Sequence, residues 1–121
     1  MDRFFFAAGS VAAFVAVALG AFGAHSLKTR LSADMLDIFE VGVRYQMYHA
    51  LGLIAVAWAI TRWPENNLNG AGWAFIIGII IFSGSLYLLS LTGMRWLGAI
   101  TPIGGIAFLI GWAILVWSIG R

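Results

Sequence analysis

Four long stretches without a charged side chain limit most strongly how this chain can fold. They cover residues 4–24, 45–61, 70–94 and 96–120. A helix needs about 20 apolar residues to cross the hydrocarbon core of a bilayer. Only helices and closed barrels satisfy their backbone polar groups in lipid, and the sequence lacks the alternating segments typical of barrel strands. The pattern therefore predicts membrane-spanning helices.

Composition supports the same interpretation. Hydrophobic residues make up 62% of the 121 residues and charged residues 10%, whereas a soluble domain has about 45–50% and 25%. We therefore expect an all-α integral membrane four-helix bundle that forms one domain over residues 1–121. Its spans should lie near residues 4–24, 42–62, 70–91 and 97–119.

The first apolar stretch has an alternative interpretation. Asp2 and Arg3, the apolar run and the small residues near Ala24 also resemble a secretory signal peptide. The run is longer than the 7–15 residues that are usual in such a peptide, so we favour a membrane span.

Local signals predict where two helices begin. Ser32 is suited to cap a helix, and Asp34 in the first turn would favour the helix dipole. We expect an amphipathic helical segment there that lies near the membrane interface and runs into the second span. Thr101 and Pro102 are a typical start for the last helix, which would leave residues 96–100 as a loop; a start at Trp96 would instead place a kink at Pro102.

Polar residues converge on one membrane face once four alternating spans are accepted. This predicted polar cluster is a candidate ligand-binding site near the face opposite the termini. Its members are His25, Tyr45, Gln46, His49, Ser83, Ser85, Tyr87 and Thr101.

Ionisable residues in or near the spans have structural and functional interpretations. Glu40 and Arg44 are four residues apart, which predicts an ion pair along one helix face. His49 is expected to face the bundle, either as a buried hydrogen-bonded histidine or as a group that handles a ligand or protons. Ligation of haem or copper by His25 and His49 is an alternative without support from any spaced ligand motif.

Other functions lack support in the sequence. Cysteine is absent and the net charge is only +2, so we expect no thiol chemistry and no nucleic-acid partner. No motif of a catalytic site is present. We therefore assign no enzymatic activity, no cofactor and no metal.

Four strings in order resemble a known family. They are "LGAFGAH" at 19–25, "YQMYHALGL" at 45–53, "SGSLYLLSLTG" at 83–93 and "TPIGGIAFLIGW" at 101–112. Together they are similar to the YgdD-like family of small inner-membrane proteins, domain of unknown function 423, to which eukaryotic transmembrane protein 256 looks related. The resemblance implies a four-helix, multi-pass protein of the bacterial inner membrane and implies no biochemical activity.

The functional hypotheses follow from the predicted polar cluster. We expect a non-enzymatic membrane protein that binds a hydrophobic ligand or serves as an accessory subunit of a larger complex. A small oligomeric transporter or proton-coupled channel is the second hypothesis, and a membrane enzyme is the third. The expected partners are the bilayer and either further copies of the chain or a larger membrane complex.

Overall fold

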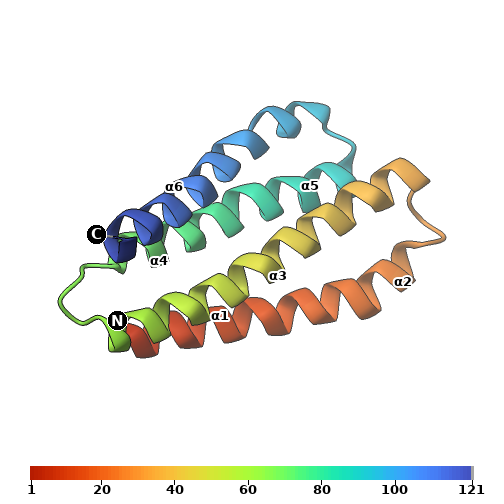
Figure 1. Cartoon of the computed structure of the whole chain (residues 1–121). Coiled ribbons are helices and arrows are strands. Elements are labelled where there is room, and N and C mark those ends of the chain that lie inside the picture. Colours follow the sequence, from red (N-terminus) through yellow and green to blue (C-terminus); the bar gives the residue numbers. More distant parts are fainter. Residues whose placement is uncertain (121) are drawn as a thin grey trace.

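Four helical rods make up the part of the chain, residues 1–120, that the computed structural model describes (Figure 1). No strand occurs within those residues. The elements of the first two rods are α1 (Asp2–Val17), a π-helical turn (Ala18–Gly23), α2 (Ala24–Leu27) and α3 (Ala33–Arg62). The elements of the last two are α4 (Asn69–Gly78), a second π-helical turn (Ile79–Ser83), α5 (Gly84–Thr92), a 3-10 turn (Arg95–Ala99) and α6 (Thr101–Gly120).

Helix ends follow the local sequence signals. The Ser32 hydroxyl accepts a hydrogen bond from the Met35 N–H at 3.2 Å, so the predicted cap of α3 is confirmed. α3 then continues without a break to Arg62, as expected for an amphipathic segment that leads into the second apolar stretch. α5 ends at Thr92 and is capped by Gly93, whose φ of 74° is the left-handed conformation that glycine adopts easily.

The last rod begins as the Thr101–Pro102 pair predicts. α6 starts at Thr101, and the residues in front of it form the 3-10 turn instead of the expected loop. The alternative, a helix from Trp96 with a kink at Pro102, is wrong. Pro102 occupies the first turn, where its missing N–H costs no intrahelical hydrogen bond.

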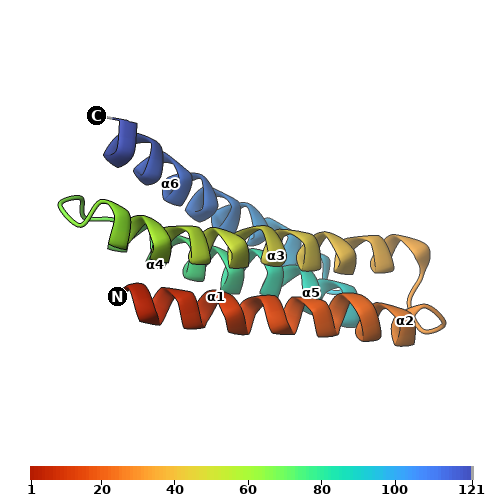
Figure 2. The ribbon, with the colours of Figure 1, turned by 60° about the horizontal axis from the view of Figure 1, so that its bottom comes forward.

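α3 is the central helix of the bundle. It packs along α1 on one side and against α4, α5 and the second π-helical turn on another. α6 packs mainly on α4 and on that same turn, and its C-terminal half diverges from α3 (Figure 2). α1 begins and α6 ends at the same end of the bundle, which we call the termini end (Figure 1).

Three of the rods are long and apolar enough to cross a membrane. They are Asp2–Leu27, Asn69–Thr92 and Arg95–Gly120, with mean hydropathies of 2.1, 2.3 and 2.1. α3 is not among them, because polar side chains such as Gln46 and His49 interrupt its apolar stretch. The expected crossing by residues 42–62, and with it the four-span domain over residues 1–121, stays a prediction.

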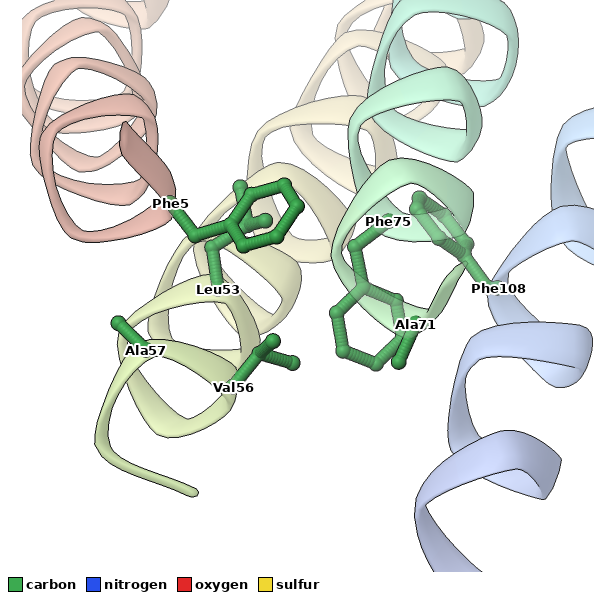
Figure 3. Close-up of a cluster of buried hydrophobic side chains, with 7 residues drawn as sticks. All are labelled: Phe5, Leu53, Val56, Ala57, Ala71, Phe75 and Phe108. Carbon is green, nitrogen blue, oxygen red and sulfur yellow. The ribbon is translucent and has the colours of Figure 1, made fainter. Parts of the chain in front are cut away.

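The core contains aromatic rings that pack directly against glycine residues of neighbouring helices. Phe5, Phe75 and Phe108 come from α1, α4 and α6 and pack with Leu53, Val56, Ala57 and Ala71 (Figure 3). A Cβ atom on Gly72, Gly111 or Gly78 would overlap the ring of Phe5, Phe75 or Phe108, respectively. Small residues thus allow the close approach of helices that membrane bundles use.

Candidate functional site

Gln46 ties three helices together at the centre of the bundle. Its side chain is 4% exposed. The amide N–H donates to the carbonyl of Ala12 in α1 at 2.8 Å, and the amide oxygen accepts from the Tyr87 hydroxyl of α5 at 2.6 Å. Interhelical hydrogen bonds of this kind give a buried amide the partners that it would lack in an apolar environment.

Ser83 makes the next contact between α3 and the third rod. Its hydroxyl, fully buried, donates to the carbonyl of Gly42 at 2.7 Å. The missing side chain of Gly42 leaves room for the Tyr87 ring, since a Cβ there would lie 2.9 Å from Tyr87 Cε1. Ser83 closes the second π-helical turn, and such turns occur frequently at functional sites.

His49 lies on a different side of α3, toward α6. Its Nδ1 is 2.8 Å from the Tyr45 carbonyl, and the Trp112 indole Nε1 donates to its Nε2 at 3.0 Å. A carbonyl can only accept and an indole N–H can only donate. The two bonds therefore assign the neutral ring, with the proton on Nδ1, and confirm the expectation that His49 faces the bundle.

Aromatic rings surround the His49 imidazole. It stacks on the Phe108 ring with centroids 3.5 Å apart and an interplanar angle of 5°. The Phe75 ring meets it edge-on at 5.2 Å. These contacts and the two hydrogen bonds fix the position of the imidazole, which is 5% exposed.

A groove of about 460 Å³ runs beside His49, between α3 and α6. We call it the α3–α6 groove. Its walls are largely aromatic and apolar, and include Tyr45, His49, Phe82, Pro102, Phe108 and Trp112. Tyr45 is 39% exposed, and its hydroxyl makes no hydrogen bond to residues 1–120. The groove thus offers stacking surfaces and one free hydroxyl.

Ser85 and Thr101 form a separate pair near the start of α6. Their hydroxyl oxygens are 2.6 Å apart, and Thr101 also donates to the Leu97 carbonyl at 3.3 Å. This pair fastens the base of α6 to α5. The members of the predicted polar cluster therefore form four sets of hydrogen bonds, centred on Gln46, on Ser83, on His49 and on this pair.

Of the remaining polar predictions, the membership of His25 in a ligand-binding cluster stays a prediction, and the predicted ion pair is contradicted by the structure. His25 is exposed on α2 and makes no side-chain hydrogen bond within the described chain, because it lies in the last turn before an exposed loop. The ion pair of Glu40 and Arg44 is not formed: within residues 1–120 the one ion pair joins the N-terminal ammonium to Asp2. Arg44 is exposed on the surface of the bundle.

Sequence reasoning missed Trp112 and Phe108 as partners of His49. Both lie in an apolar stretch where aromatic residues are common, so the residue types alone carried no signal. The one available sign was position, because Phe108 and Trp112 are four residues apart and therefore share a helix face.

The chemistry of these sets is that of binding and positioning. Among residues 1–120 no group of three or more His, Cys, Asp or Glu side chains could hold a metal. The polar side chains bond to one another and to helix carbonyls, which orders the bundle. The α3–α6 groove is where a further molecule could contact several of them at once.

Comparisons with known proteins place the chain in a family. A family model described as "Protein of unknown function (DUF423)" matches residues 19–105. The "UPF0382 membrane protein SSP2132" of Staphylococcus saprophyticus is 49% identical, over 94% of this chain and 94% of its own length. The "UPF0382 membrane protein YwdK" of Bacillus subtilis is 46% identical, also over 94% of both chains.

Relatives in other species match to a similar extent. A "UPF0382 membrane protein" of Staphylococcus epidermidis is 50% identical over 94% of this chain and 93% of its own length. No solved structure matches. The family model and these relatives cover most of the sequence, so the chain belongs to the DUF423 family, as its four motifs suggested.

Proposed function

We propose that this chain is a multi-pass protein of the inner, or plasma, membrane in which all four rods cross the bilayer. Three rods have the length and hydropathy for a crossing, and α3 lies among them. The buried polar side chains of α3 turn toward neighbouring helices, as Gln46 and His49 do. The printed names of the relatives, which call them membrane proteins, support the same assignment.

We further propose that the protein binds a small hydrophobic ligand in the α3–α6 groove. The observation that carries this proposal is the neutral, immobilised His49 ring in the wall of an otherwise apolar groove. Ligand sites are typically apolar and aromatic concavities with a few well-placed polar groups. The Tyr45 hydroxyl at the same wall would orient a ligand that carries a hydrogen-bonding group.

The buried polar side chains favour a binding role over transport, because they are already hydrogen-bonded between helices. Gln46, Ser83, Ser85 and Tyr87 are each engaged in hydrogen bonds that hold helices together. A transport pathway would need polar groups that are free to exchange partners with a substrate. The expected homo-oligomer or larger membrane complex stays a prediction, which mass spectrometry of the purified protein also tests.

Two matched glycine variants test the groove. In Gly105→Leu the new side chain enters the groove, and its Cβ meets only the Phe82 ring at an ordinary 3.9 Å. In the control, Gly84→Leu, the new Cβ has open space around it. Both changes replace glycine by leucine in a helix, so their effects on helix propensity are similar.

The readout is mass spectrometry of the small molecules that co-purify with each variant. We expect one compound to accompany the wild type and Gly84→Leu and to be strongly depleted in Gly105→Leu. Identical sets of compounds in all three proteins, with all three folded, would contradict ligand binding in this groove.

A further inference from the structure

A second cleft lies at the termini end, between the first turns of α1 and the last turns of α3. It has a volume of about 660 Å³ and shares no lining residue with the α3–α6 groove. Asp2, Arg3 and Thr61 line one end of it, and Phe6, Ile54 and Trp58 line its apolar part. We call it the α1–α3 cleft.

Helix packing explains the shape of this cleft. α1 and α3 approach closely at Gly9, where a Cβ would lie 2.7 Å from the Ala50 carbonyl oxygen. Nearer the termini end, the small side chains of Ala7 and Ala57 leave space between the helices. From Ile54 to Thr61 the cleft extends along roughly 10 Å of helix. It therefore has an apolar body and a polar end, like an amphiphile.

The polar end carries charges of both signs. Arg3 is exposed and makes no ion pair within residues 1–120. The Asp2 carboxylate has only a contact of 3.9 Å with the N-terminal ammonium, and both groups are partly exposed. The Arg3 guanidinium and the Asp2 carboxylate thus lie at the polar end of the apolar cleft, with the N-terminal ammonium close to the carboxylate.

Tryptophan side chains lie at the same level of the bundle as this polar end, and they indicate a membrane interface there. Trp58 and Trp63 contact each other near the end of α3, and Trp73 contacts Phe4 and Phe5 of α1. Tryptophan is enriched where the hydrocarbon core meets the lipid headgroups. The charges of Asp2 and Arg3 therefore lie where a headgroup would be.

We propose that the α1–α3 cleft binds a glycerophospholipid with an ethanolamine headgroup. Its phosphate contacts the Arg3 guanidinium, its ammonium donates to the Asp2 carboxylate, and one acyl chain lies along Phe6, Ile54 and Trp58. The charge pattern selects this headgroup. The quaternary ammonium of a choline lipid has no N–H to donate, and a glycerol headgroup brings no cation to Asp2. The proposal rests on the membrane crossing proposed above and does not depend on a ligand in the α3–α6 groove.

Native mass spectrometry of the full chain in mild detergent tests this selectivity. The probes are dioleoyl lipids with ethanolamine, choline or glycerol headgroups, added singly at equal concentration. We expect the wild type to retain the ethanolamine lipid about tenfold better than the choline lipid, which corresponds to about 1.4 kcal/mol. Asp2→Asn should abolish this preference, whereas Arg3→Gln should weaken the retention of all three lipids.

Two further variants separate the cleft from general effects of charge and folding. Arg95→Gln removes an exposed cation at the opposite end of the bundle and should change nothing. Ala7→Phe fills the apolar body and should lower the retention of every lipid.

The outcomes that overturn the proposal are distinct. Equal retention of the three lipids, a preference for the glycerol headgroup, or an unchanged preference in Asp2→Asn would each refute it. Gly105→Leu should retain the ethanolamine lipid normally. A failure of the α3–α6 groove hypothesis would therefore leave this result intact, and the reverse also holds.

Discussion

The hydrogen bond between Tyr87 and Gln46 offers the sharpest test of how the bundle is held together. Tyr87→Phe removes a single oxygen, which donates to the Gln46 amide oxygen at 2.6 Å. Gln46 is 4% exposed, so its amide oxygen would lose this partner in a buried site. The other bond of Gln46, to the Ala12 carbonyl, would stay in place.

Two kinds of measurement give limits for the loss of unfolding free energy expected in Tyr87→Phe. A buried polar group left without a partner costs about 1–3 kcal/mol, while interhelical hydrogen bonds in membranes average about 0.6 kcal/mol and reach about 1.7. We therefore expect Tyr87→Phe to lower the free energy of unfolding by about 1–2 kcal/mol. Tyr48→Phe is the control, because Tyr48 is 53% exposed, and it should have an effect within about 0.5 kcal/mol.

Reversible unfolding in mixed micelles, followed by circular dichroism, measures both variants. Adding Gln46→Leu completes a double-mutant cycle, in which we expect a coupling energy of at least about 0.5 kcal/mol. If Tyr87→Phe cost no more than Tyr48→Phe, or if the cycle were additive, the central bond between α3 and α5 would contribute nothing, and the reasoning would be refuted.

Two other predictions concern the packing and the charges. Gly72→Ala places a Cβ in the Phe5 ring and should be about 2 kcal/mol less stable than the control Gly84→Ala. The control gains helix propensity and has open space for its Cβ. Equal stabilities of the two variants in the same unfolding assay would count against tight packing at Phe5. The effects of Glu40→Ala and Arg44→Ala on the free energy of unfolding should add within about 0.3–0.5 kcal/mol, since the two side chains form no ion pair. A larger coupling in the double mutant would show that the pair does form.

Local sequence signals predicted the helices well, because they act over a few residues. Ser32 fixed the start of α3 through a hydrogen bond to the third residue after it. Pro102 fixed the first turn of α6 through its missing N–H. Gly104 and Gly111 are seven residues apart and therefore share a face of α6, where they abut Phe82 and Phe75.

The grouping of the polar side chains could not be predicted in the same way. Gln46 and His49 are three residues apart, so they differ by only about 60° around the helix. α3 is surrounded by neighbours, and that angle is enough to send Gln46 to α1 and α5 and His49 to α6. The π-helical turn at Ile79–Ser83 also shifts the later residues of its rod away from an ideal helical wheel. Such effects depend on how whole helices pack.

The crossing of α3 is the claim on which both proposed sites depend, and cysteine labelling tests it most directly. The natural chain contains no cysteine, so single cysteines at Lys28 and Asn67, on either side of α3, can be probed in intact cells with an impermeant maleimide. We predict that one position is labelled from outside and the other only after the membrane is permeabilised. Labelling of both positions from the same side would contradict a transmembrane α3, and the four-span account with it.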